Sequence, residues 1–411
     1  MISRLWLLWL IAIPGLTAQS LQQEDILRLA RIKTAIKKHL QGMPNYTCLQ
    51  TVERYQRFPN SKTESLIDVL RLEVAYVTGR EMYAWPGSTQ FEDTELREIV
   101  TTGAFSTGAF ALHARAIFLG DGTTFRFGGE EDFEGKPALR FDYDTAQFRS
   151  GYQIRNPRRG IGAVVAYHGS IWAHRETFEL LRISVEADEI PSEIEIVKAS
   201  DRLDYQLMKI GSGEALLPRQ SEVQILDNRG KLAINKTRLS RCKQYSGEST
   251  LSFDDVGEAG EASSKQTRIL QFEPYTELEL ALDFELNHES FAVGDAIQAV
   301  LRNEIREGKT VIAQKGSIAK GRILRLEHQV GDYSTYNITL QFDELLGPDW
   351  RAALKLRFSR TDPPTGTPPD MRAQGQTVRL VTVPDTQPNG FLVFSKKLKL
   401  SRGFTTIWQT Q

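Results

Sequence analysis

Apolar and polar residues alternate with a period of two along most of this 411-residue chain, which is the spacing of half-buried β-strands. The alternation is cleanest near the C-terminal end, where Leu278, Leu280 and Leu282 are separated by Glu279 and Ala281. Short turns separate the earlier segments, which indicates a meandering antiparallel sheet. In the first 245 residues we expect strands at 46–58, 66–77, 81–85, 123–127, 138–143, 162–167, 171–173, 180–186, 194–198, 204–210, 219–226 and 231–245.

Two segments depart from this alternation and predict helices. In residues 20–41, Ile26, Leu29 and Leu40 recur at helical spacing, and glycine and proline follow directly after the segment. Residues 93–119 are rich in Ala, Gly and Phe, which predicts one or two weak helices. The first 245 residues therefore combine one N-terminal helix, a long run of strands and a helical interruption.

The last part of the chain is again β-rich. Residues 278–286, 336–342 and 354–358 alternate with one polar side, which is typical of sheets that are wet on one face. We expect a short helix at 295–305 and a proline-rich loop at 359–376. The tail, at 398–408, is expected to close the sheet. These features predict a small β-barrel or sandwich domain.

The first residues have the features of an export signal. Arg4 precedes a short apolar run that ends at Pro14, and Leu16–Thr17–Ala18 offers a cleavage site after Ala18. The apolar run is short for a membrane span. We therefore predict a signal peptide at 1–18 and a periplasmic or outer-envelope location, with an uncleaved N-terminal anchor as the alternative.

Cys48 and Cys242 are the two cysteines of the chain, and they stand in the first and the last predicted strand of the first β-rich block. An exported chain folds where thiols oxidise, so we predict a disulfide between them, with two free buried thiols as the alternative. Ser, Gly, Glu and Asp dominate 246–267, which predicts a flexible linker. We therefore divide the mature chain into domains at 20–245 and 268–411.

Composition and motifs argue against several function classes. With 51 Lys and Arg against 52 Asp and Glu, the net charge of −1 argues against a nucleic-acid partner. Ser317 and Lys320 have the spacing of penicillin-interacting enzymes, but their flanks indicate a turn into a strand rather than a helix. His168 and His174 are separated by a predicted turn, which spoils metal-ligand spacing. We expect no enzyme activity, no metal and no cofactor.

The order of elements in 20–245 resembles the periplasmic lipoprotein-carrier group, which includes the outer-membrane lipoprotein carrier and related lipid-binding proteins. The glycine-led segment 135–143 looks like a strand common to that group, and Trp172 followed by Leu181 and Arg182 looks like its tryptophan-bearing hairpin. The resemblance implies a half-open β-barrel whose hollow is covered by helices and binds acyl chains or other apolar molecules. The two cysteines are an addition to that pattern.

From this resemblance we expect apolar side chains to line the hollow. The candidates are aromatic residues near the helical interruption and on the strands: Trp85, Phe105, Phe110, Phe118 and Trp172. The alternative is that the helical segment packs permanently into the core. A half-open barrel would make the strands of Cys48 and Cys242 its edges, so a disulfide would require either that the sheet curls nearly closed or that the two edges meet at one rim.

The C-terminal part resembles the outer β-barrel domain of conjugation and type IV secretion channel proteins. The segments that carry this resemblance are 293–295, 312–317, 321–323 and 342–345. The complete fold class that we predict is mainly β, a curved antiparallel half-barrel with an N-terminal helix and covering helices, followed by a second small β domain. The expected function is that of a non-enzymatic envelope protein with a lipid or acyl-chain ligand and an envelope protein partner; the alternative is a structural or assembly protein of the envelope or of a secretion apparatus, without a ligand.

Overall fold

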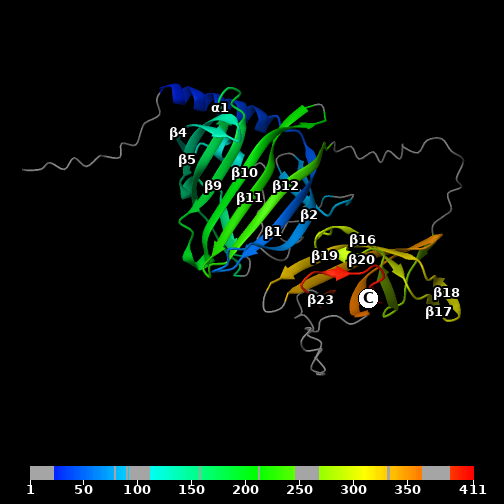
Figure 1. The fold of residues 1–411 in the computed structure, drawn as a ribbon. Helices are drawn as coiled ribbons and strands as arrows, with labels where there is room; N and C mark the ends of the chain where they lie inside the picture. Colours follow the sequence, from blue (N-terminus) through cyan, green and yellow to red (C-terminus); the bar gives the residue numbers. More distant parts are fainter. Residues whose placement is uncertain are drawn as a thin grey trace, which may run out of the picture.

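A computed structural model describes residues 23–77, 80–88, 91, 112–156, 159–211, 213–245, 268–330, 334–362 and 389–411. Most of these residues are in strands, as predicted, and the strands form two large sheets (Figure 1). The predicted signal peptide, the predicted linker, Phe105 and Phe110 lie outside the described residues. Within the described residues, no helix has the length and apolar character that crossing a bilayer requires.

The first sheet has ten antiparallel strands in the order β3-β2-β1-β12-β11-β10-β9-β8-β5-β4, and it curls into a half-barrel (Figure 1). Its first strand, β1, pairs with its last, β12, so both lie inside the sheet, and the edges are β3 and β4. The elements of this part are α1 Gln23–Gln41, β1 Tyr46–Arg57, β2 Ser65–Val77, β3 Arg80–Ala84, α3 Leu112–Leu119, β4 Thr123–Phe133, β5 Lys136–Thr145, η1 Gln147–Arg149, β6 Gln153–Asn156, β7 Ile161–Val164, β8 Ala166–His174, β9 Leu180–Asp188, η2 Ser192–Ile194, β10 Ile196–Ile210, β11 Gly213–Asp227 and β12 Leu232–Gln244.

Helices α1 and α3 cover the concave face of this sheet. The buried residues of α1 include Leu29, Ile32, Ile36 and Leu40, which lie one helical turn apart and pack in one cluster with inward residues of the strands. Ile26, which we expected on the same face, is 52% exposed, because Asp25 takes the buried position in the first turn. The predicted helix at 20–41 and the C-terminal part of the helical interruption are confirmed.

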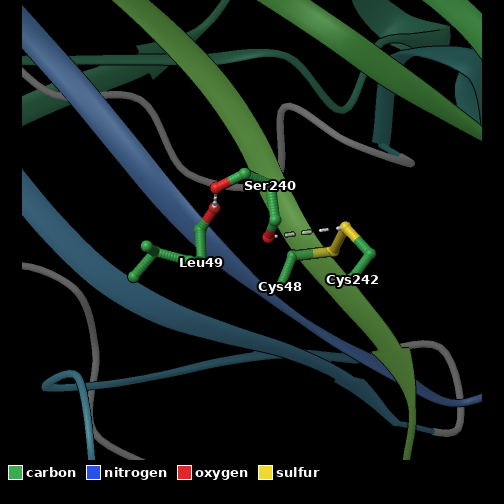
Figure 2. Close-up of a disulfide and its surroundings, with 4 residues drawn as sticks. All are labelled: Cys48, Leu49, Ser240 and Cys242. Carbon is green, nitrogen blue, oxygen red and sulfur yellow. Dashed lines mark hydrogen bonds between the residues drawn. A yellow bond between two sulfur atoms is a disulfide. The ribbon is translucent and has the colours of Figure 1, made fainter.

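The predicted disulfide between Cys48 and Cys242 is present, with a Cα–Cα distance of 4.1 Å. Figure 2 shows it joining β1 and β12 beside Leu49 and Ser240, whose hydroxyl donates to the Leu49 carbonyl at 3.4 Å. The expectation that it joins two edge strands is wrong. The strands are direct neighbours within the sheet, so the bond requires no meeting of rims.

The second sheet follows the order β13-β21-β20-β19-β16-β14-β25-β22, with β23 paired to β20. The side chains of Phe358 on β22 and Phe391 on β23 stack at 5.4 Å, so the sheet curls until its last strand meets β23. Its strands are β13 Arg268–Leu270, β14 Glu277–Leu282, β15 Leu286–Asn287, β16 Ala296–Leu301, β17 Ile305–Glu307, β18 Thr310–Ala313, β19 Ile318–Gln329, β20 Thr335–Leu346, β21 Trp350–Ala353, β22 Leu356–Asp362, β23 Gly390–Phe394, β24 Lys399–Leu400 and β25 Thr405–Thr410.

Two expectations for this domain are wrong. Residues 295–305 contain strand β16 rather than a helix, because Ile297, Ala299 and Leu301 alternate into the core. Residues 359–362, at the start of the predicted loop at 359–376, belong to strand β22, and the rest of that segment lies outside the described residues. The tail closes the sheet as expected, with β25 between β14 and β22.

The C-terminal domain docks on a free stretch of the edge of the half-barrel. Strand β3 pairs only with residues 73–77 of β2, which leaves the earlier part of β2 open. There the amide of Arg71 donates to the Val293 carbonyl, and the amide of Val293 donates to the Val69 carbonyl, both at 2.8 Å. An open strand edge is a site for unwanted pairing, so this contact protects the sheet.

Candidate ligand site on the concave face

An apolar cluster fills the concave face between β4 and β11. The strands contribute side chains that alternate inward, and the helices contribute their buried faces. Phe118 of α3 is 7% exposed and stacks on Phe125 of β4 with ring centroids 6.3 Å apart. The cluster comprises Leu29, Ile32, Ile36, Leu40, Ala114, Ile117, Phe118, Phe125, Leu139, Phe141, Tyr143, Tyr167, Ile171, Ala173, Leu180, Ile183, Val185, Leu203, Tyr205 and Leu216.

One glycine allows a buried tyrosine to cross the sheet. The Tyr143 hydroxyl on β5 reaches over β8 and donates to the Ser184 carbonyl on β9 at 2.7 Å. Gly169 on β8 lies beneath this crossing, where a Cβ atom would stand 1.9 Å from the same carbonyl oxygen. A larger residue at this position would therefore displace the tyrosine and open the packing.

A buried histidine–aspartate pair fastens α3 to the sheet. His113 Nε2 lies 2.6 Å from Asp201 Oδ2, and the Tyr152 hydroxyl donates to the same oxygen at 3.5 Å. The imidazole packs edge-to-face on the Tyr152 ring at 5.3 Å. Since Asp201 is on β10 and His113 on α3, the pair fixes where the short helix sits on the concave face.

A band of polar side chains runs beside the apolar cluster on the same face. In register across neighbouring strands, Asp68 on β2 lies opposite Arg54 on β1, and Arg54 lies opposite Asn235 on β12. Arg54 Nε donates to Asp68 Oδ1 at 2.6 Å, and Arg54 Nη2 donates to Asp68 Oδ2. We call the buried residues Gln50, Arg54, Asp68, Asp201, Tyr205, Ser221, Asn235 and Thr237 the polar band.

Four polar atoms of this band have no hydrogen-bond partner within the part of the chain that the structure describes. They are Gln50 Oε1, Asp201 Oδ1, Tyr205 Oη and Ser221 Oγ. Most buried polar atoms in native proteins are hydrogen-bonded, and each one left unpaired costs about 1–3 kcal/mol. Such atoms mark the places where a ligand or ordered water would be received.

The tyrosines of the concave face stay protonated. Burial raises the pKa of Tyr205 well above its ordinary value, and the charge of Glu81 adds to this effect. Burial likewise raises the pKa of Tyr152, with a further contribution from Asp201. These hydroxyls therefore act as neutral groups that can both donate and accept.

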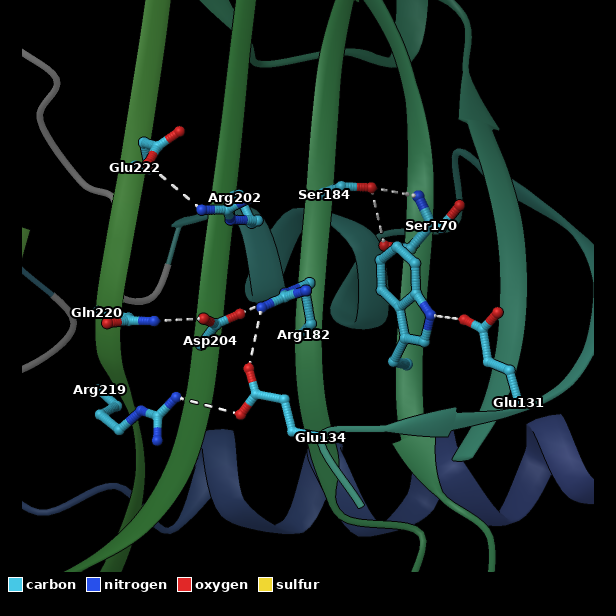
Figure 3. Close-up of polar contacts among 11 residues, drawn as sticks. Glu131, Glu134, Ser170, Arg182, Ser184, Arg202, Asp204, Arg219, Gln220 and Glu222 are labelled. Atoms are coloured by element: carbon cyan, nitrogen blue, oxygen red, sulfur yellow. Dashed lines mark hydrogen bonds and ion pairs between the residues drawn. The ribbon is translucent and has the colours of Figure 1, made fainter. Parts of the chain in front are cut away.

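The outer face carries a ladder of ion pairs (Figure 3). Glu134 lies 3.5 Å from both Arg182 and Arg219, and Gln220 donates to Asp204 at 2.7 Å. Arg182 also donates to Asp204, and α1 lies behind the strands in this view. Glu134 and Arg219 are exposed, whereas Asp204 is buried and accepts hydrogen bonds from both Arg182 and Gln220, so the ladder links β9, β10 and β11 on this face.

The two tryptophans expected at the hollow lie elsewhere. Trp172 is opposite Arg140 and Arg182 in register, so it belongs to the outer face, where its indole Nε1 donates to Glu131. Trp85 lies at the seam between the domains, with the Arg322 guanidinium 5.7 Å from its ring centroid. Of the five predicted lining residues, Phe118 alone among those described lies in the apolar cluster.

The motifs that we excluded on sequence grounds form no site in the structure. Ser317 lies in a turn, where its hydroxyl donates to the Gln314 carbonyl at 2.7 Å, and Lys320 follows within β19. The turn expected between His168 and His174 is absent, because β8 is continuous through both. His168 instead lies 2.8 Å from Asp188, and within the described ranges no three His, Cys, Asp or Glu residues are placed to hold a metal.

Sequence reasoning missed the His113–Asp201 pair. One signal was present: Asp201 has the same parity on its strand as Ala199, Leu203 and Tyr205, which places a carboxylate on the apolar side. Nothing in the spacing linked it to His113, which is 88 residues away. The polar band could be expected only after the sheet register was known.

Comparison with known proteins finds a partial likeness in solved structures. No family model matches the chain, and no curated protein matches it. A "putative outer membrane lipoprotein-sorting protein domain" from Vibrio parahaemolyticus is similar at 11% identity and a TM-score of 0.30, over 53% of this chain and 92% of that one. A LolA superfamily protein from Nitrosomonas europaea is similar at 10% identity and a TM-score of 0.27, over 52% of this chain and 94% of that one. A DUF1329 family protein from Desulfovibrio piger is similar at 10% identity and a TM-score of 0.26, over 53% of this chain and 91% of that one.

Proposed function

We propose that this chain is an exported, non-enzymatic binding protein of the cell envelope, whose half-barrel holds the apolar part of a lipid-type ligand on its concave face. The observation that supports this proposal is the cover of the apolar cluster, which consists of helices α1 and α3 rather than of a second sheet. An acyl chain is apolar like the buried faces of these helices, so it can replace a helix against the apolar cluster.

The short helix α3 is the movable part of the cover. A helix of eight residues is marginal by itself, so its position depends on what it packs against. Ala114, Ile117 and Phe118 supply its apolar contacts, and the His113–Asp201 pair supplies its polar one. A bound acyl chain would take the place of these apolar contacts.

The Cys48–Cys242 disulfide supports an oxidising compartment, which agrees with the export signal predicted at 1–18. The C-terminal domain completes the open edge of β2 through Val293, and in our proposal it also carries the surface for an envelope partner. The resemblance of this domain to secretion-channel barrels remains a prediction.

The binding proposal is tested on full-length protein purified from its own envelope. Native mass spectrometry with lipid extraction should reveal a co-purifying ligand, and the delipidated protein should bind a fluorescent fatty acid. Phe118→Ala should strengthen this binding at least fivefold, because it removes an apolar contact of α3 that the acyl chain has to replace. Phe148→Ala is the matched control, because Phe148 is 82% exposed and should leave binding unchanged.

A second candidate function is a structural or assembly role in which the half-barrel is filled by its own helices. The tight packing of Phe118 on Phe125 favours it. Absence of both a co-purifying lipid and fatty-acid binding would overturn the proposed function and favour this one.

A further inference from the structure

Three buried polar atoms on the concave face lie on the neighbouring strands β10 and β11, and a fourth lies on β1. Ser221 on β11 lies opposite Leu203 on β10, and Asp201 and Tyr205 are the inward residues on either side of Leu203. Diagonal neighbours across a strand pair lie about 7–8 Å apart, so a group bound at Ser221 can reach Asp201 on one side and Tyr205 on the other. Gln50 lies on β1, two strands further along the same face.

The four residues are buried, and these atoms are unpartnered in the described part of the chain. Gln50 and Asp201 are each 4% exposed, and Tyr205 and Ser221 are each 6% exposed. The other carboxylate oxygen of Asp201 is already used by His113 and Tyr152, so Oδ1 is the oxygen left to receive a ligand. This part of the concave face therefore offers polar atoms that are free to form hydrogen bonds, in addition to apolar surface.

The chemistry of these atoms selects the kind of group that would fit. Asp201 Oδ1 and Gln50 Oε1 can only accept hydrogen bonds, while the hydroxyls of Tyr205 and Ser221 can donate or accept. An incoming anion at this position would meet the carboxylate of Asp201, which repels it. The cation of the band, Arg54, cannot offset this, because two of its nitrogens already donate to Asp68.

We infer that the polar band receives a head group that donates hydrogen bonds, either hydroxylated or ammonium-bearing, and that it discriminates against phosphate and carboxylate head groups. This inference rests on the proposed function, since it assigns the polar end of the ligand whose apolar part lies in the cluster. The head group lies at Ser221, with Asp201 and Tyr205 as its diagonal neighbours on β10.

The test compares head groups on one common chain. Delipidated full-length protein is titrated with four probes that carry the same fluorescent acyl chain and end in a monoacylglycerol, an amine, a carboxylate or a phosphate. The glycerol or amine probe should bind at least tenfold more tightly than either anionic probe. Equal affinities, which would mean that water satisfies the four atoms, or tighter binding of the anions would overturn the inference while leaving the proposed function intact. If none of the four probes binds, the proposed function itself fails.

Two buried tyrosines provide matched variants. Tyr205→Phe removes an unpartnered hydroxyl, so it should preserve folding and reduce the preference for the glycerol probe about fivefold. Tyr83→Phe removes a hydroxyl that is bonded to Glu81 on β3, outside the apolar cluster and the polar band, so it should lower stability and leave the preference unchanged. Identical preferences in the two variants would overturn the assignment of Tyr205.

Discussion

Cys48 and Cys242 are 194 residues apart in the sequence, yet they join two strands that are hydrogen-bonded neighbours in the middle of the sheet. The ladder shifts register at this point, so that Cys48 stands opposite both Arg241 and Cys242. Arg241 has a positive φ of 52°, as expected for a residue in a bulge. The disulfide therefore fixes the β-bulge in the pairing of β1 with β12.

The disulfide should contribute substantially to the stability of the half-barrel. Replacing both cysteines by alanine should lower the free energy of unfolding by about 2–5 kcal/mol, because the crosslink closes a long loop in the unfolded chain. Chemical denaturation of the two proteins measures this difference. Non-reducing peptide mapping of the exported protein should show one peptide pair joined through Cys48 and Cys242; two thiols that react with an alkylating reagent would contradict the bond.

Removing one partner of the buried ion pair between Arg54 and Asp68 should lower the stability of the protein strongly. Arg54→Met leaves Asp68 buried without its cation, and we expect it to lower the free energy of unfolding by about 3–5 kcal/mol. The double variant Arg54→Met, Asp68→Leu removes both charges and should regain most of this loss. Urea denaturation of the three proteins tests the coupling.

An exposed ion pair serves as the control for this measurement. Lys397 and Glu289 lie 2.9 Å apart on the surface, and Lys397→Met should change stability only slightly. A loss of equal size in Arg54→Met and in the double variant would show that the side-chain volume at position 54, rather than the unpaired charge, accounts for the effect.

The period-two pattern predicted most of the strands because each strand has one buried face. In β16, Ile297, Ala299 and Leu301 obey the same rule, and the helix expected there was wrong because a short segment can satisfy both periods. The pairing of β1 with β12 could not be predicted, since alternation specifies which side chains face inward and not which strand lies alongside. This is why the disulfide was expected at the edges.

The candidate site was harder to predict than the fold. Trp172 looked like a lining residue because it is large and apolar, yet its even position on β8 turns it to the outer face with Ser170. Asp201 and Ser221 carry no motif and become neighbours only through the register of β10 and β11. The structure was therefore needed to bring these residues together.

Gly294 should be essential for the docking of the two domains. It adopts a φ of +99°, and an added Cβ would stand 2.2 Å from the Arg71 carbonyl oxygen and 3.0 Å from the Trp85 ring. Gly294→Ala should separate the C-terminal domain from β2, which would raise the hydrogen-exchange rate of the Arg71 amide. Exchange measured by NMR or mass spectrometry reports this directly.

Gly316→Ala is the matched control for the docking experiment. Gly316 has a similar φ of +93°, but nothing lies within 4 Å of an added Cβ. This variant should therefore carry only the backbone strain of about 1–2 kcal/mol, and the Arg71 amide should remain protected. If both variants expose the Arg71 amide equally, the close approach at Gly294 does not hold the domains together.

Two histidines of the C-terminal domain contact the backbone of β2, and the burial of one of them should make stability fall in acid. His288 Nε2 donates to the Ile67 carbonyl at 2.9 Å, and His328 lies 5.8 Å from His288 and stacks on Tyr336 at 4.5 Å. Burial, with a smaller effect from His288, lowers the pKa of His328 below its ordinary value of 6.5. The exposed pair Glu289–Lys397 lies nearby and carries no net charge.

The direction of this dependence follows from the lowered pKa. Well above pH 6.5, His328 is neutral in both the folded and the unfolded protein, so its contribution to stability is fully present. As the pH falls below 6.5, the unfolded protein takes up the proton first, and this contribution is lost until the pH passes the lower pKa of the folded form. The free energy of unfolding of the wild-type protein should therefore fall more between pH 7.5 and pH 5 than that of His328→Phe, while His168→Gln, on the outer face, should follow the wild type. Urea denaturation at the two pH values measures this; an equal fall in the wild type and in His328→Phe would show that His328 does not contribute.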